Sequence, residues 1–390
     1  MDEDALLRFA RDLVAIPTEN PPGRDYERCV ERIRAELDAL DIAHEVVQTG
    51  DTDTRRCTIL GRVGDEGPLV YLHGHYDVVP GFAAEQFEPR VEDGFLIGRG
   101  SSDMKGGLAA IVHAARAAAE AGVQVGLVIV PDEETGGRLG AERLAELGRL
   151  DPTAAGAIVA EPTWGTVWHA CRGAYTLRVV VRGRPAHIGL HYDGVNAFAG
   201  AVDVAVALRG LESLLRERRS GLAFASDDPR AAESILLVGG MAGGGTNFNV
   251  VPAEFALTVD RRPNPDEDYD CAKHELLAVL EACGSAGSDL SWDVLQDARS
   301  AETPAESGFV LALVDAVAEI SGARPGVTCC PGVLEIRVYT RLGIPAVAFG
   351  PGLIGEMHGP DERVPVANLA AAARIYAAAA GRVRDLSNGG

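Results

Sequence analysis

Positive charge is scarce in this chain, and lysine is almost absent. The 390 residues include 57 acidic residues against 36 lysines and arginines, which gives a formal net charge of -21. Only Lys105 and Lys273 are lysines, a bias that we interpret as codon usage rather than adaptation to salt. A nucleic-acid-binding protein needs a basic surface, and an anionic membrane attracts basic segments. The composition therefore argues against partners of both kinds.

Long apolar runs and paired cysteines are also missing. No stretch approaches the roughly 20 apolar residues of a membrane helix, and the acidic start Met1-Asp2-Glu3-Asp4 is unlike a signal peptide. A cytoplasmic protein without a membrane partner is therefore expected. The seven cysteines are irregularly spaced, and the sequence contains no C-x-x-C motif. Both facts argue against a disulfide framework or a cysteine-bound zinc ion.

Short apolar segments alternate with amphipathic helical patterns over much of the chain. Strands are expected at 42–47 and 57–63, both as edge strands, and at 69–72, 95–98, 125–130, 157–160 and 346–349. Helices are expected at 4–16, 26–40, 108–121, 139–147 and 307–320, and from Val366 onward. This alternation predicts an α/β fold with a mostly parallel sheet flanked by helices.

The pattern changes near Arg172. From there the predicted order is strand, helix, strand, strand, helix, strand, which is the ferredoxin-like α+β arrangement. We therefore expect a main domain formed by 1–172 and 297–390, with a separate domain, 173–296, inserted into it.

Charged side chains follow several predicted strands. His75, Asp103, Glu134 and Glu161 each come soon after a short apolar segment, and His358 follows the last strand after a loop. Singly, each has an ordinary structural explanation, but in a parallel sheet such positions converge on one edge. Carboxylates gathered there would repel one another without a cation. Two histidines and three carboxylates suit zinc, with cobalt or manganese as alternatives, and five ligands fit two ions better than one.

Five motifs carry a family resemblance. They are His75-Tyr-Asp77-Val-Val, Gly100-Ser-Ser-Asp103-Met-Lys-Gly-Gly, Asp132-Glu-Glu-Thr-Gly136, Ala160-Glu161-Pro162 and Met357-His358-Gly-Pro-Asp-Glu362. Together they resemble the M20 metallopeptidases, which include acetylornithine deacetylase, succinyl-diaminopimelate desuccinylase, aminoacylase and glutamate carboxypeptidase. The resemblance covers nearly the whole chain. It implies a zinc-peptidase-type catalytic domain and an inserted ferredoxin-like lid through which two copies form a homodimer.

The resemblance also implies a division of the metal ligands. His75 and Glu161 would hold one ion, Glu134 and His358 would hold the other, and Asp103 would bridge the two.

Further roles follow from the same resemblance. Glu133 would be the general base, and Asp77 would hydrogen-bond His75 and fix its tautomer. The peptide bond between Asp103 and Met104 would be cis.

The inserted domain has its own matches to the family. Gly183-Arg-Pro-Ala-His187 resembles the lid motif whose histidine reaches the partner subunit's site and binds the developing oxyanion. Asn249 resembles a residue that contacts substrate. An arginine, Arg262 or its neighbour Arg261, would bind the substrate's free carboxylate.

The chain departs from the family at one place. Relatives often carry a Thr-Asp-Ala-Arg-like run where this chain has Leu334-Glu335-Ile336-Arg337, so Glu335 is a candidate for contact with substrate. The predicted function is the removal of an acyl group from an N-acyl amino acid, of the acetylornithine or succinyl-diaminopimelate type. A dipeptidase or carboxypeptidase with the same site is the alternative. A non-catalytic metal-binding protein is a more remote one, because no ligand is missing and the base is present.

Overall fold

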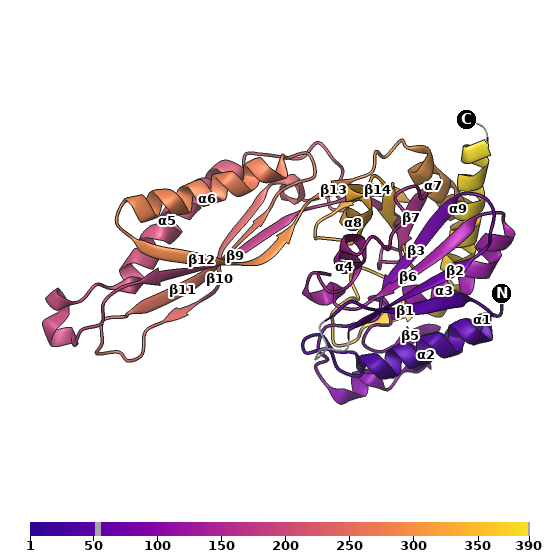
Figure 1. The fold of residues 1–390 in the computed structure, drawn as a ribbon, viewed down its shortest axis with the longest axis horizontal. Coiled ribbons are helices and arrows are strands. Elements are labelled where there is room, and N and C mark those ends of the chain that lie inside the picture. Colours follow the sequence, from indigo (N-terminus) through magenta and orange to yellow (C-terminus); the bar gives the residue numbers. More distant parts are fainter. Residues whose placement is uncertain (51–55, 389–390) are drawn as a thin grey trace. The chain divides into compact units, whose positions relative to one another are not determined.

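The computed structural model describes residues 1–50 and 56–388, and the chain divides into two compact units (Figure 1). The first unit comprises Met1–Ala170, Glu302–Thr328 and Glu335–Gly390. The second comprises Cys171–Ala301 and Cys329–Leu334. The catalytic and lid roles that we expect for these units remain predictions.

The main sheet of the first unit has the strand order β1-β2-β6-β3-β7-β15-β8-β13, with β14 pairing to β8. The strands are β1 Ala43–Gln48, β2 Cys57–Val63, β3 Leu69–His75, β6 Gln124–Val130, β7 Gly156–Val159, β8 Thr166–Cys171, β13 Ala301–Glu302, β14 Gly326–Cys330 and β15 Ala346–Ala348. The strands β6, β3, β7 and β15 are parallel, while β1, β2 and β6 pair antiparallel. The prediction of an edge strand at 57–63 is wrong, because β2 lies between β1 and β6.

Helices cover both faces of this sheet, as the neighbours of β3 show. A side chain at Gly74 would point at Leu108 and Ile111, whereas the Tyr71 and His73 rings lie 5.7 and 5.6 Å from the ring of Tyr339. Successive residues of a strand point to opposite faces, so all of β3 is buried. The helices of this unit are α1 Glu3–Val14, α2 Tyr26–Ala39, α3 Lys105–Glu120, α4 Ala141–Glu146, α7 Gly308–Ser321, α8 Ile336–Arg341 and α9 Val366–Asn388. The predicted α/β fold is confirmed.

A small antiparallel sheet lies apart from the main one. It has the order β16-β5-β4, with β4 Arg90–Glu92, β5 Phe95–Ile97 and β16 Arg363–Pro365. The predicted strand at 95–98 is thus real but lies outside the parallel sheet. Asp103 is therefore not delivered by the end of a parallel strand, as the sequence suggested, but by the turn that precedes α3.

The second unit has one antiparallel sheet in the order β10-β11-β9-β12. Its elements are β9 Ala174–Arg182, α5 Ala197–Leu215, β10 Ile235–Gly244, β11 Glu254–Arg262, α6 Tyr269–Ser285 and β12 Asp289–Ala298. Leu177 and Val179 alternate inward along β9 and pack in one core with Val204, Leu208 and Leu276 of the two helices. Figure 1 shows both helices along this sheet. The predicted strand and helix order is confirmed.

Short 3-10 helices occur at Ala84–Phe87 (η1), Glu133–Thr135 (η2), Ile188–Asp193 (η3) and Pro229–Ala232 (η4). Among the described residues, no helix combines the length and apolarity that crossing a membrane requires.

Candidate metal centre and active site

Three neighbouring parallel strands deliver four of the predicted site residues. His75 is the last residue of β3, Glu133 and Glu134 begin η2 soon after β6, and Glu161 follows β7 by two residues. Because β6, β3 and β7 are adjacent, their carboxyl ends meet at one edge of the sheet. The sequence pattern located this edge correctly.

Asp103 lies at the centre of the cluster. Its Oδ1 is 3.3 Å from His75 Nε2 and its Oδ2 is 3.1 Å from His358 Nε2. His358 Nε2 is also 3.4 Å from Glu134 Oε2. Two groups of three result, His75 with Asp103 and Glu161, and Asp103 with Glu134 and His358, and in each group the ligand atoms lie within 4.8 Å of one another.

The local backbone around Asp103 and His358 is unusual. The Asp103–Met104 peptide bond is cis, which confirms that prediction. His358 has a φ of 59°, in the left-handed region that residues other than glycine rarely adopt. Both residues lie in turns rather than in helices or strands.

The hydrogen bond of His75 fixes its tautomer. Its Nδ1 lies 2.9 Å from the main-chain oxygen of Asp77 and 3.5 Å from the Asp77 carboxylate. A carbonyl oxygen can only accept, so Nδ1 carries the hydrogen and Nε2 is directed at Asp103. The prediction that Asp77 orients His75 needs one correction: the closer acceptor is the main-chain oxygen, because the carboxylate is engaged elsewhere.

That carboxylate holds the turn that carries the two glutamates. Asp77 is fully buried, and its Oδ1 accepts the backbone N–H of Glu133 while its Oδ2 accepts that of Glu134, each at 3.2 Å. Glu134 Oε1 in turn accepts the backbone N–H of Val79 at 3.2 Å. The carboxylate of Glu133 makes no hydrogen bond within residues 1–50 and 56–388.

Crowded negative charge perturbs the acids of this cluster. Burial and the nearby charge of Asp103 raise the pKa of Glu161 to about 8. Burial and the charge of Glu161 raise the pKa of Glu133 well above its usual range. Hydrogen bonds to Asp103 and Glu134 raise the pKa of His358 to about 10. The cluster therefore favours added positive charge, whether it comes from protons or from a bound cation.

The donor set fits divalent metal ions. Glu161 is 5% exposed, yet its Oε1 is buried without a hydrogen-bond partner among the described residues. Imidazole nitrogens and carboxylate oxygens facing one point are ligands for zinc, cobalt or manganese. The cation would satisfy the unpartnered oxygen and take the place of the bound protons.

Sequence reasoning missed a buried ion pair behind this cluster. Glu362 Oε1 accepts the backbone N–H groups of Ser102 and Asp103 at 3.0 and 2.9 Å, and its Oε2 accepts from Arg99 Nη1 at 2.6 Å. Arg99 Nη2 also donates to the main-chain oxygen of His358 at 3.3 Å. Glu362 belongs to the last of the five motifs, but nothing local in the sequence indicates its partners.

Glu335 lies beneath the glutamate turn. It is 2% exposed, its Oε2 pairs with His73 Nε2, and His73 Nδ1 lies 2.8 Å from the Tyr339 hydroxyl. A side chain at Gly137 would approach Glu335 Oε1 at 2.7 Å, and the charge of Glu335 contributes to the raised pKa of Glu133. The predicted contact between Glu335 and substrate stays a prediction.

Within the second unit, two predicted residues lie side by side. His187 and Val250 form an antiparallel bridge, and the N–H of Ile188 donates to the main-chain oxygen of Asn249 at 2.9 Å. His187 Nδ1 accepts the N–H of Gly189 at 3.1 Å. The neutral ring therefore carries its hydrogen on Nε2 and can donate from that atom.

The two arginines of β11 differ in accessibility. Arg261 is completely buried and bonds to Ser234 and Glu267, each at 2.6 Å. The Arg262 side chain is 27% exposed and pairs with Asp260 at 2.9 Å. A substrate carboxylate could reach Arg262 without disrupting a buried network, which favours it over its neighbour.

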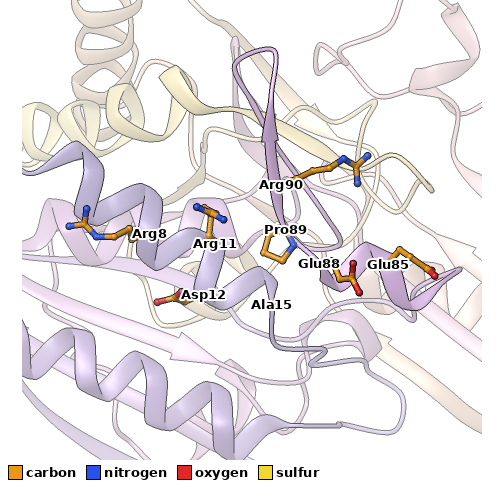
Figure 2. Close-up of a pocket in the computed structure, with 8 residues that line it drawn as sticks. All are labelled: Arg8, Arg11, Asp12, Ala15, Glu85, Glu88, Pro89 and Arg90. Atoms are coloured by element: carbon orange, nitrogen blue, oxygen red, sulfur yellow. The ribbon is translucent and has the colours of Figure 1, made fainter.

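A separate cleft of about 710 Å³ lies on the first unit (Figure 2). It is lined by α1 and by the segment around η1, through Arg8, Arg11, Asp12, Ala15, Glu85, Glu88, Pro89 and Arg90. The lining includes three arginines and three carboxylates, and Asp12 is paired with Arg32 at 2.9 Å. The cleft contains none of the predicted site residues, so we assign it no function.

Comparison with known proteins points to one family. A sequence model described as Peptidase family M20/M25/M40 matches residues 71–382. A succinyl-diaminopimelate desuccinylase of Methylorubrum populi is 29% identical, over 96% of this chain and 97% of that protein. A putative succinyl-diaminopimelate desuccinylase of Mycobacterium tuberculosis is 31% identical, over 94% of this chain and 95% of that protein. The M20 metallo-carboxypeptidase Sso-CP2 of Sulfolobus solfataricus matches the fold with a TM-score of 0.79 at 15% identity, covering 99% of this chain and 100% of that one.

Proposed function

The chain belongs to peptidase family M20/M25/M40, and on this premise we propose that it is a metal-dependent amide hydrolase that removes the acyl group from an N-acyl amino acid. N-succinyl substrates are the leading class, because a succinyl-diaminopimelate desuccinylase and a putative one match nearly the whole chain. The observation that carries the proposal is the cluster in which two groups of candidate ligands share Asp103. The carboxylate of Glu133, which makes no hydrogen bond to any described residue, lies close enough to Glu161 and His75 to interact with their charges.

The metal ions would be held by the two groups. His75 and Glu161 would bind one divalent ion, Glu134 and His358 would bind the other, and Asp103 would bridge them, with zinc favoured by the imidazoles. When bound, such ions polarise the amide carbonyl and lower the pKa of the attacking water.

Glu133 would move the proton. It would accept a proton from the water whose oxygen forms the new C–O bond, and it would deliver a proton to the amine nitrogen as the C–N bond breaks. Asp77 supports this role by binding the backbone N–H of Glu133. Burial and the charge of Glu161 raise the pKa of Glu133, and a carboxylate with a raised pKa accepts a proton more readily.

The second unit would serve as a lid that completes the site. His187 would donate from Nε2 to the oxyanion that develops on the carbonyl oxygen, and Arg262 with Asn249 would contact the substrate's carboxylate end. Following the family resemblance, we assign His187 to the site of a partner copy, so the active form would be a homodimer.

Exposed apolar side chains support a dimer through this unit. Val206 of α5 and Met241 of β10 are 64% and 73% exposed, and α5 with β10 and β11 borders an apolar groove of about 330 Å³. β10 is also an edge strand of its sheet. Apolar surface of this kind marks protein interfaces. Light scattering should give a dimer mass that Val206→Asp shifts toward monomer.

The test of the function is a substrate panel with a matched variant. N-succinyl, N-acetyl and dipeptide substrates are assayed with zinc, cobalt and manganese, alongside Glu133→Gln. The variant should retain two metal ions per chain by elemental analysis and lose roughly 10²–10⁴-fold in kcat. Full activity in Glu133→Gln would overturn the assignment of the base. Preference for dipeptides would instead identify a dipeptidase, and metal binding without hydrolysis of any of these amides would leave a non-catalytic metal-binding protein.

A further inference from the structure

We propose that Asn20 is a positioning residue, which sets the orientation of Glu133 by holding the carboxylate of Asp77. The inference rests on the proposed function in one respect: the consequence for turnover requires that Glu133 be the base. The positioning itself is a property of the folded chain and can be measured without substrate.

The segment around Asn20 runs along the residues that follow β3, which include Asp77. The N–H of Asn20 donates to the main-chain oxygen of Val78 at 2.8 Å, and the N–H of Val78 donates to that of Thr18 at 3.0 Å. The Thr18 hydroxyl donates to the main-chain oxygen of Tyr76. The chain before α2 is thereby fixed against the residues that follow β3, so the Asn20 side chain has little freedom.

The Asn20 amide lies among acceptors. It is 1% exposed, and its Nδ2 lies 2.9 Å from Asp77 Oδ2, 3.0 Å from Thr135 Oγ and 3.2 Å from Asp132 Oδ1. Its Oδ1 faces the donor Arg56 Nη2 at 3.5 Å. These neighbours fix which end of the amide is nitrogen, because carboxylates accept and a guanidinium donates.

Asn20 thus joins the two aspartates that flank the glutamate turn. Asp132 precedes Glu133 in the chain, is in the left-handed region with a φ of 72°, and also pairs with Arg56 at 3.0 Å. Asp77 binds the backbone N–H groups of Glu133 and Glu134. Within the described residues, Asp77 Oδ2 accepts hydrogen bonds from the Asn20 amide and from the N–H of Glu134. If the Asn20 amide is removed, only the bond from Glu134 remains of these two.

The residue type matters as well as the position. An aspartate at residue 20 would have the same shape but would place a third carboxylate against Asp77 and Asp132 and remove the donor. Repulsion would then turn Asp77 away from the backbone of Glu133. A displacement of about 1 Å at a reacting group can cost roughly 10²-fold in rate, so a small rotation of Asp77 is sufficient to affect turnover.

Amide hydrogen exchange of the metal-free protein tests the positioning directly. In Asn20→Ala, the peptide spanning 131–137 should exchange at least several-fold faster than in the unsubstituted protein. The matched control is Asn368→Ala, which removes another buried asparagine whose Nδ2 donates to a main-chain oxygen at 3.1 Å; it should leave that peptide unchanged. Equal exchange in both variants would overturn the proposal.

Steady-state kinetics tests the consequence. Asn20→Ala and Asn20→Asp should lower kcat about 10- to 100-fold with KM within about threefold of the unsubstituted enzyme, while Asn368→Ala keeps both constants. If Asn20 acts through Asp77, adding Asn20→Ala to Asp77→Asn should cost far less than it costs alone. Fully additive losses would contradict the proposal.

One further variant and two further outcomes separate a positioning role of Asn20 from a structural one. Should Asn20→Ala fail to fold, Asn20→Ser retains a donor on a shorter side chain and should give an intermediate exchange rate and an intermediate kcat. A substituted protein with normal exchange at 131–137 and normal kcat, but a lower melting temperature, would reduce Asn20 to a structural role. If the unsubstituted chain hydrolyses no amide, the proposed function fails, and the exchange experiment alone still decides the positioning.

Discussion

Arg99 donates to Glu362 across 2.6 Å, and both side chains are almost completely buried. The same carboxylate accepts the backbone N–H of Asp103, and the same guanidinium reaches the main-chain oxygen of His358. One ion pair therefore braces two proposed metal ligands that come from distant parts of the chain. The positions of Asp103 and His358 therefore depend on an ion pair that would itself contact neither metal nor substrate.

Replacement of Glu362 should weaken both stability and metal binding. In Glu362→Gln, an amide can still accept from Asp103, but Arg99 loses its counter-charge in a buried position. Breaking a buried pair costs about 3–5 kcal/mol, and losing support behind a ligand costs about 10- to 100-fold in metal affinity. Urea denaturation and metal titration measure the two effects. The control is Asp315→Asn, which breaks an exposed pair with Arg324 and should change neither by much.

The stability of the metal-free protein should fall as pH rises from about 5 to 8. The pKa of Glu161 is raised to about 8, so between its unfolded and folded values the folded state holds a proton that the unfolded chain has released. Stability then decreases with pH. The pKa of His358, raised to about 10, acts in the same direction above the usual histidine value.

Urea midpoints of the metal-free protein between pH 5 and 8 measure this slope, and Glu161→Gln should flatten it. Metal should stabilise more at pH 8 than at pH 5.5, because the ligands must lose their protons to bind it. Metal-free stability that increases across this range would contradict the assignment of these groups.

Substitution of the two lysines should have very different effects on the stability of the protein. Lys105 is fully buried, its Nζ donates to the main-chain oxygens of Leu13 and Ile16 at 3.0 and 2.6 Å, and burial lowers its pKa to about 8. Lys105→Met should destabilise the protein by about 3 kcal/mol, because two buried carbonyl groups lose a charged donor. Lys273→Met, which removes a partly exposed pair with Asp297, should cost under about 1 kcal/mol.

An amine-directed reagent offers an independent check on the same pair. Peptide mass spectrometry of the native protein should find Lys273 modified and Lys105 protected, and unfolding should expose both. Rapid native labelling of Lys105 would mean that α3 is not tied to the end of α1 in solution.

His187→Ala should lower kcat while the dimer persists and KM changes little, because the ring would act on the transition state rather than on the bound substrate. His191→Ala, in the exposed 3-10 helix η3 that His187 precedes, is the matched control and should have normal kinetics. Turnover is compared with light scattering on the same samples. An effect confined to KM would exclude the oxyanion role.

Local pattern was sufficient to predict much of the fold. The apolar segment 125–130 and the acidic pair that follows it identified β6 and the end of it that carries the proposed base, since strand periodicity and turn residues act over a few positions. The order of elements after Arg172 was predicted correctly for the same reason. The motifs then named the residues that the structure brings together around Asp103.

Local sequence pattern could not predict which distant segments pair with one another. Two features of the sheets depend on which surfaces meet after folding: β2 lies inside the main sheet, and β5 lies outside it. The same is true of the hydrogen bonds from Asn20 to Asp77 and from the Asp103 N–H to Glu362. No local period encodes such contacts, because the partners lie far apart in the chain. The sequence by itself determined which side chains could bind metal and move a proton. Only the tertiary structure decided which buried partners orient them, since hydrogen-bond direction is a property of the packed chain.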